Sequence, residues 1–203
     1  MRRYPAIRPR SVTVERAHLE DVLYVVPIHV RLWLLLCSDL AIRSGTAAAL
    51  GPRHYNQDTT TLQFTTKKQA KVHLPVTDEI RELIEHCDLS VDVPFVRQLW
   101  KATTGPAMRK DTSVLNTTMS LRATMRRALV EAGLPHTFIP HDLRRTTAVA
   151  MLEATHDLRD VQALLGHSSL QSTIWYLDHD LRPVKRSTLE MIKRPAWRKD
   201  RTA

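Results

Sequence analysis

The stretch "LGHSSLQSTIWY", residues 165–176, brings a glycine, a histidine and a tyrosine into twelve consecutive positions. Gly166 is expected to end one helix, because glycine readily adopts the left-handed conformation that closes a helix. His167 follows at once, and one of the two serines after it caps a second helix that carries Tyr176. The pattern therefore predicts two short helices, with His167 at the turn between them. Whether Tyr176 packs in the core or acts as a nucleophile depends on the rest of the chain.

A second stretch, "IPHDLRRTTA" at residues 139–148, places a histidine and an arginine at the start of another helix. Pro140 favours the first turn of a helix, so His141 lies at its beginning and Arg144 follows one turn later on the same face. Taken singly, each of these features has an ordinary interpretation. A His-x-x-Arg pair is usually a solvated helix face, Gly-His is usually a helix end, and a tyrosine beside apolar residues is usually part of the core.

The charge of the chain favours a polyanionic partner. Its 203 residues include 30 lysines and arginines against 21 acidic residues, a formal net charge of +9. Such a field attracts nucleic acid from a distance, and a basic surface without a specific partner is the simpler alternative. The length fits one domain, while an aromatic content of 5% and only five glycines argue against an all-β barrel or sandwich. We therefore expect a mainly helical domain.

Cysteine and histidine usage supports neither a disulfide framework nor a metal centre. Cys37 and Cys87 are too few and too isolated for either, which favours a reducing cytoplasm. The histidines form no His-Glu-x-x-His pair, and "DHD" at residues 178–180 is most simply a polar turn. The chain has no glycine-rich phosphate loop either. No metal and no cofactor are expected.

The beginning of the chain predicts neither a signal peptide nor a membrane span. "MRRYPAIRPR" is charged and lacks an apolar region, and residues 1–12 are interpreted as a basic arm, with a disordered tail as the alternative. Pro27, His29 and Arg31 interrupt the apolar run at residues 22–36. That run predicts two buried helical segments that meet at Pro27.

Hydrophobic periodicity divides the rest of the chain into helices and one hairpin. Apolar residues alternate in "TLQFTT" and in "KVHLP", which predicts two antiparallel strands joined by the tip "KKQAK". Residues 88–112 are interpreted mostly as a connection. Helices are expected from about Thr13, at 28–40, in an alanine-rich stretch ending at Gly51, after an N-cap at Thr77, at 114–132, from Pro140, before Gly166 and around Tyr176.

Taken together, the two quoted stretches resemble a known family. The order His-x-x-Arg, Leu-Gly-His and Tyr, with 32 residues from Arg144 to Tyr176, resembles the tyrosine recombinases, the family of phage integrases and Xer-type resolution enzymes. Upstream, "LLLCSDLAIRSGTAAAL" is similar to the first box of that family, with Arg43 in the place of its arginine. The resemblance spans about residues 11–192. It implies a mainly α (α+β) catalytic domain, a helical bundle with a small antiparallel three-stranded sheet.

The resemblance also implies a reaction and an active site. Members of the family cut and rejoin DNA at specific sites through a 3′-phosphotyrosine, without metal or ATP, so double-stranded DNA is the implied partner. A lysine on the hairpin belongs to the site, and its usual eight-residue distance to a strand-ending proline selects Lys67 over Lys68. The implied catalytic residues are Arg43, Lys67, His141, Arg144, His167 and Tyr176.

These residue types suit attack on a phosphodiester. The guanidinium groups of Arg43 and Arg144 match the oxygens of a pentacoordinate phosphate and neutralise its extra negative charge. A free tyrosine has a pKa of about 10, so Tyr176 needs His141 as a base and the field of the arginines to ionise. The lysine can protonate the leaving 5′-oxygen, and His167 can hydrogen-bond a phosphate oxygen.

The resemblance implies contacts between protein copies and with the duplex. Members act as a synaptic tetramer that exchanges a C-terminal segment, so "STLEMIK" at residues 187–193 is the candidate contact of a homotetramer, with a helix packed on its own domain as the alternative. The chain is interpreted as one catalytic domain with a core at 13–180 and a basic tail at 181–203, without room for the N-terminal DNA-clamping domain of most members. The expected phosphate contacts are Lys68, Lys71, Arg122, Arg126 and Arg145.

The chain departs from the family pattern around Arg43. The family usually has Thr-Gly ahead of this arginine and an acidic residue three positions after it, whereas this chain reads "SDLAIR" and has Thr46 in the acidic position. Three alternatives to a recombinase in a prokaryotic cytoplasm or nucleoid stay open. They are a type IB topoisomerase with the same residues, a non-catalytic DNA-binding regulator or mobile-element remnant, and a catalytic fragment that needs a separate clamping domain.

Overall fold

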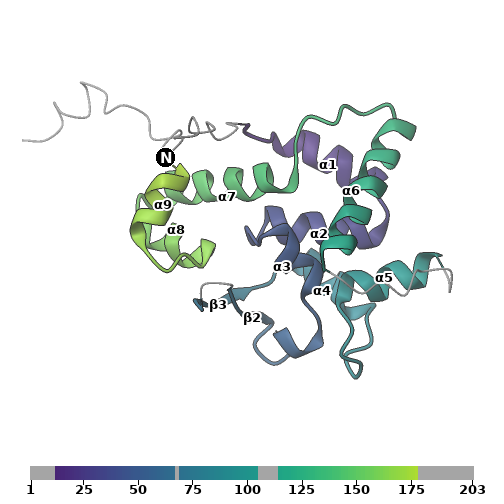
Figure 1. Cartoon of the computed structure of the whole chain (residues 1–203), viewed down its shortest axis with the longest axis horizontal. Coiled ribbons are helices and arrows are strands. Elements are labelled where there is room, and N and C mark those ends of the chain that lie inside the picture. Colours follow the sequence, from purple (N-terminus) through teal and green to yellow (C-terminus); the bar gives the residue numbers. More distant parts are fainter. Residues whose placement is uncertain (1–11, 67–68, 105–113, 178–203) are drawn as a thin grey trace, which may run out of the picture.

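The protein is mainly helical and contains one small antiparallel sheet, as the sequence predicts (Figure 1). The computed structural model describes residues 12–66, 69–104 and 114–177. Several expected features lie outside these ranges: nearly all of the basic arm, Lys67, Lys68, "DHD" and the basic tail with "STLEMIK". The predicted fold class is confirmed within the described residues.

A helix that is apolar on nearly every side forms the centre of the molecule. In α2 (Ile28–Ser38) the side chains from Leu32 to Cys37, with Trp33 among them, are completely buried. α1 (Arg16–Val25) begins three residues after the expected cap Thr13, and Pro27 separates α1 from α2 as predicted. No helix in the described ranges is long and apolar enough to cross a membrane. The helices that contact α2 are α3 (Ser44–Ala49), α4 (Asp78–Glu85), α5 (Phe95–Thr104), α6 (Val114–Glu131) and α7 (Pro140–Thr155).

The interpretation of residues 88–112 as a connection is wrong, because α5 lies within this segment and packs on α2. Phe95, Val96 and Leu99 bury the apolar face of α5. The helix is short and follows the turn-forming residues "DVPF", so only a few apolar positions carry its periodicity. Packing against α2 stabilises a helix that the local pattern does not distinguish from a loop.

The sheet has the strand order β1–β2–β3 after the short 3₁₀ turn η1 (Pro52–His54). β1 (Tyr55–Asn56) adds a short edge to the predicted hairpin of β2 (Thr61–Thr65) and β3 (Lys71–Pro75). The pair Leu62 and Leu74 is buried, and in β3 the residues that alternate with the buried Val72 and Leu74 are exposed, whereas in β2 Thr61 is buried beside Leu62. This alternation is the reason that the hairpin could be predicted from sequence.

The last three described helices gather at one end of the molecule beside the hairpin (Figure 1). α8 (Leu158–Leu165) and α9 (Leu170–Leu177) pack on α7, and α8 also contacts β3. α9 begins after Ser169, whose hydroxyl accepts a hydrogen bond from the amide of Ser172 at 3.3 Å, as expected for a cap. These helices enclose a second, smaller hydrophobic cluster, formed by Ala41, Ala148, Val161, Leu165 and Leu177.

Candidate active site

Gly166 brings the hairpin and the end of α8 into contact. Its φ of 56° ends the helix in the left-handed conformation that the sequence predicts. A Cβ atom at this position would lie 2.5 Å from Cγ2 of Val72 and 2.9 Å from Cγ2 of Thr66. Glycine is therefore required both for the backbone conformation and for the close approach of the hairpin. The hairpin lies directly against the residue that precedes His167.

The hairpin ends in a short loop closed by Thr66 and Ala70. The amide of Thr66 donates to the carbonyl of Ala70 at 2.8 Å, and the amide of Ala70 donates to the hydroxyl of Thr66 at 3.2 Å. Lys67 and Lys68 follow Thr66 in the sequence and lie outside the described residues.

Arg144 is a buried arginine that two backbone carbonyls hold in place. It is 3% exposed. One terminal nitrogen donates to the carbonyl of Ala41, and the other donates to the carbonyl of Leu165 at 2.9 Å. A guanidinium has five N–H donors, so these bonds fix its plane and leave further donors for a ligand. Through Arg144, α7 is tied both to the loop before α3 and to the end of α8.

Arg43 is the exposed last residue of the loop that connects α2 to α3. The backbone on both sides of it is held from α2. The amide of Ile42 donates to the carbonyl of Leu36 at 3.0 Å, and the indole N–H of Trp33 donates to the carbonyl of Ser44 at 2.9 Å. These bonds to its neighbours in the chain fix the backbone position of Arg43.

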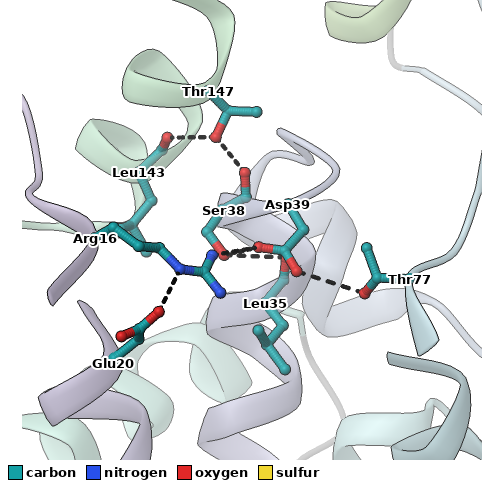
Figure 2. Close-up of polar contacts among 8 residues, drawn as sticks. All are labelled: Arg16, Glu20, Leu35, Ser38, Asp39, Thr77, Leu143 and Thr147. Atoms are coloured by element: carbon teal, nitrogen blue, oxygen red, sulfur yellow. Dashed lines mark hydrogen bonds and ion pairs between the residues drawn. The ribbon is translucent and has the colours of Figure 1, made fainter. Parts of the chain in front are cut away.

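Two side chains of α7, one turn apart, bind the end of α2 and the loop that follows it. Thr147 donates to the carbonyl of Ser38 (Figure 2), and Arg144 donates to the carbonyl of Ala41. Ala41 has a φ of 49°, a left-handed conformation that costs a residue with a side chain about 1–2 kcal/mol. Ala41 is also completely buried, so the bonds to α7 and the packing together hold the loop in this conformation.

Asp39 joins this loop to α1 and α4 (Figure 2). Its carboxylate accepts a hydrogen bond from the hydroxyl of Ser38 at 2.8 Å and lies 3.5 Å from a guanidinium nitrogen of Arg16. Thr77, the residue before α4, donates to the same carboxylate at 3.5 Å. Thr77 occupies the predicted N-cap position, but its side chain bonds to Asp39 instead of to its own helix.

Tyr176 lies between the two histidines and beside Arg144. The centre of its ring is 5.4 Å from the ring centre of His141 and 5.7 Å from that of His167. The central guanidinium carbon of Arg144 is 6.0 Å from the same ring centre. The phenol oxygen is buried, and it has no hydrogen bond of normal geometry within the described residues. The structure thus brings these four predicted site residues together around one phenol.

The charges in this cluster shift one another's pKa values. Burial raises the pKa of Tyr176, and the positive charges of Arg144, Arg145 and Arg43 oppose that rise. Burial, followed by the charge of Arg43, lowers the pKa of Arg144 to about 10, so this guanidinium is still charged at neutral pH. Partial burial and then the charge of Arg144 lower the pKa of His141. A neutral His141 can accept a proton, which is the form that a general base requires.

The ring of His167 contacts the helix that carries Tyr176. Its Nδ1 atom lies 3.1 Å from the hydroxyl of Thr173, a completely buried residue of α9. The backbone of His167 is held by α8 instead: its amide donates to the carbonyl of Gln162 at 3.1 Å, and the Gln162 side chain donates to its carbonyl at 3.0 Å. The main chain and the ring of His167 are therefore fixed by different helices.

The expected DNA contacts differ in exposure. Lys71 on β3 is exposed, and so are Arg122 and Arg126, which share one face of α6. Arg145 is 3% exposed and acts through its charge on Tyr176. A direct phosphate contact by Arg145 would require a change that uncovers its guanidinium.

Neither a metal centre nor a reactive thiol accompanies Tyr176 in the part of the chain that the structure describes. No three histidine, cysteine or acidic side chains lie close enough there to hold a metal ion. Burial raises the pKa of Cys37 to about 12, although the positive charges of Arg144 and Arg122 lower it. This thiol is therefore protonated at neutral pH. Tyr176 is therefore the candidate nucleophile that the cluster surrounds.

Comparisons with known proteins show the family and the fold of the chain. The phage integrase family model matches residues 18–182. Tyrosine recombinase XerC of Chlamydia caviae is 40% identical over 74 residues, 36% of this chain and 23% of XerC. The crystal structure of XerA recombinase matches with a TM-score of 0.61 at 19% identity, over 93% of this chain and 65% of that one. A post-cleavage complex of XerH site-specific recombinase with a palindromic difH substrate matches with a TM-score of 0.56 at 20% identity. This match covers 89% of this chain and 52% of the XerH chain.

The matched segment includes both quoted stretches, the hairpin and Arg43, so the chain belongs to the phage integrase family. Its fold is that of the catalytic domain of tyrosine recombinases. The chain spans only about a fifth to a quarter of the length of the curated relatives it matches.

Proposed function

We propose that this protein is a site-specific DNA recombinase that cuts and rejoins DNA through a 3′-phosphotyrosine. The observation that carries the proposal is the convergence of Arg144, His141 and His167 on the side chain of Tyr176. A buried phenol beside a fixed guanidinium and two imidazoles is suited to attack on a phosphodiester, because every neighbour either takes a proton or stabilises negative charge.

Each residue has a role in the proposed cleavage step. The phenol oxygen of Tyr176 attacks the phosphorus atom, and a P–O bond to tyrosine forms while the bond to the 5′-oxygen breaks. His141 accepts the phenol proton, and Lys67 gives a proton to the 5′-oxygen. Arg43 and Arg144 neutralise the charge on the non-bridging oxygens. In the rejoining step a 5′-hydroxyl attacks the phosphorus atom and the bond to the Tyr176 oxygen breaks, while Lys67 takes the hydroxyl proton and His141 returns its proton to the phenol.

Double-stranded DNA is the proposed partner. The formal net charge of +9 supports it, and the related XerH was seen with its difH substrate. The proposed phosphate contacts are the exposed Lys71, Arg122 and Arg126, together with Lys68. We also propose that the chain acts as a single catalytic domain and assembles as a homotetramer on DNA.

One experiment tests the proposed function. The protein is incubated with nicked duplexes made from the DNA that flanks its own coding sequence, and products are separated in SDS. The proposal predicts a covalent protein–DNA adduct that disappears in Tyr176→Phe and persists in Tyr24→Phe, since Tyr24 is an exposed tyrosine far from the cluster in sequence. DNA binding without any adduct would support a non-catalytic regulator instead. Relaxation of supercoiled DNA that lacks these flanking sequences would support a topoisomerase.

A further inference from the structure

The contact between His167 and Thr173 supports a second inference, which rests on the proposed function. We propose that Thr173 is a positioning residue: its hydroxyl orients the imidazole of His167 toward the phosphate. Thr173 is completely buried, and the distance from its hydroxyl oxygen to Nδ1 of His167 is 3.1 Å. No pattern in the sequence separated this threonine from the other residues of α9.

In the proposed arrangement the Thr173 hydroxyl is the donor to Nδ1, and this direction sets which ring nitrogen of His167 carries the proton. In a neutral imidazole one nitrogen donates and the other accepts. When the Thr173 hydroxyl donates to Nδ1, the ring proton lies on Nε2, which is on the side of the ring opposite Thr173. Nε2 can then donate to a phosphate oxygen. Partners that orient metal-ligating histidines are worth about 10-fold to 100-fold in affinity or activity, and we expect an effect of similar size for the partner of a phosphate-binding histidine.

Thr173 also links His167 to the nucleophile. Thr173 and Tyr176 are three residues apart on α9 and therefore lie on the same face. The main chain of His167 is held by Gln162 of α8, so only its ring depends on α9. When α9 packs in place, it supplies the nucleophile and orients the phosphate donor together. The site is then complete only while Tyr176 is in position.

The first test does not need DNA. We would record the ¹⁵N signals of the His167 ring in the full chain, assigned by their loss in His167→Gln. Thr173→Val is nearly isosteric and removes only the hydroxyl, and it should redistribute the ring proton between Nδ1 and Nε2. Thr173→Ser should restore the wild-type signals. The matched control is Ser172→Ala, which removes a contact with Ser169 on the same helix but none with His167. Ring signals that are unchanged in Thr173→Val overturn the proposal.

The second test measures adduct formation in single turnover on the nicked duplexes. Thr173→Val should lower the rate about 10-fold or more with DNA affinity unchanged, and Thr173→Ser should recover most of the rate. In a His167→Gln background, Thr173→Val should have little further effect, because the group that it positions is absent. If Thr173→Val lowers the rate of adduct formation equally in the wild-type and His167→Gln backgrounds, Thr173 only stabilises α9. That result would overturn the proposal. If the wild type forms no adduct, the recombinase function fails, while the ring signals still decide the role of Thr173.

Discussion

Arg144 and Ala41 are joined by a hydrogen bond from a guanidinium to a backbone carbonyl, across 103 residues of sequence. The same guanidinium donates to the carbonyl of Leu165 and lies beside the ring of Tyr176. Arg144 is therefore both a structural clamp between three segments and the buried cation of the candidate site. Its substitution is expected to affect stability and chemistry by different amounts, which can be measured separately.

Arg144→Lys should separate these two roles. Lysine keeps the charge but does not present two parallel N–H pairs, so it cannot bond both carbonyls and a phosphate together. We expect adduct formation to fall by about 10³-fold or more, with a loss of stability of about 1–3 kcal/mol from unpaired carbonyls. Rates, DNA affinity and thermal unfolding are compared with Arg159→Lys on the exposed side of α8. A rate within tenfold of the wild type would remove Arg144 from the proposed chemistry.

Thr147→Val should disturb Arg43 without touching it. The substitution removes the bond to the carbonyl of Ser38, the last residue of α2, which precedes the loop that ends at Arg43. Thr155→Val is the matched control, because Thr155 also bonds the carbonyl four residues before it but contacts no part of this loop. We expect Thr147→Val to lower the rate of adduct formation about tenfold, and Thr155→Val to leave it near the wild-type value. Equal rates for the two variants would contradict a role of α7 in placing Arg43.

Gly166→Ala should lower the free energy of unfolding by more than the left-handed backbone conformation alone would explain. Gly166 and Gly133 both have a positive φ, but a Cβ at Gly133 would meet nothing within 4 Å. Gly133→Ala should therefore cost about 1 kcal/mol of unfolding free energy, whereas Gly166→Ala should cost at least about 2 kcal/mol because the hairpin must move. Gly166 directly precedes His167, so adduct formation should also fall further in Gly166→Ala than in Gly133→Ala. Similar denaturation midpoints for both variants would refute the close approach.

The parts of the fold that could be predicted from the sequence are those with a local signal. The alternation in "TLQFTT", Pro27 between two apolar runs and the glycine after α8 each have a short-range cause. The amphipathic α5 was missed because its stability depends on α2. In the candidate site, Tyr176, His167, His141, Arg144 and Arg43 were predicted from the resemblance of the residue order and spacing to a known family.

The supporting contacts of the site could not be predicted in the same way. Trp33 and Thr147 donate hydrogen bonds to backbone carbonyls of distant residues. Because every residue has a backbone carbonyl, the sequence does not indicate which residue is the acceptor. For Arg145, residue type alone suggested an exposed side chain that the structure does not have. A second arginine beside Arg144 favours a surface contact with DNA, yet the packing of α7 buries it. Helical spacing places Thr173 on the same face as Tyr176, but it does not single out this threonine as the partner of His167.

The free energy of unfolding should decrease as the pH falls from about 6.5 to about 4, the range in which folded His29 stays neutral. Burial lowers the pKa of His29 to about 4, and its ring stacks on Trp100 at 5.2 Å. Between the unfolded value of about 6.5 and 4, the unfolded chain binds a proton that the folded chain does not, so the unfolding free energy decreases as the pH decreases. The loss reaches on the order of 3 kcal/mol at the acid end of this range.

His29→Gln cannot titrate, so its unfolding free energy should vary less between pH 6.5 and pH 4 than that of the wild type. His54 and His141, whose pKa values are also lowered first by burial, contribute in the same direction and remain in both proteins. Urea denaturation at several pH values measures the difference. The exposed His156→Asn serves as the control, since asparagine tolerates the left-handed conformation found there. Parallel pH profiles for wild type and His29→Gln would contradict the assignment.

The most direct test of the central claim is to locate the DNA on the protein. The covalent adduct formed on a nicked duplex is digested with nuclease and trypsin, and the modified peptide is sequenced by mass spectrometry. Our account predicts a nucleotide joined through its 3′-phosphate to Tyr176, in the peptide that also contains His167 and Thr173. A nucleotide on any other residue, or an adduct that persists in Tyr176→Phe, would contradict the account.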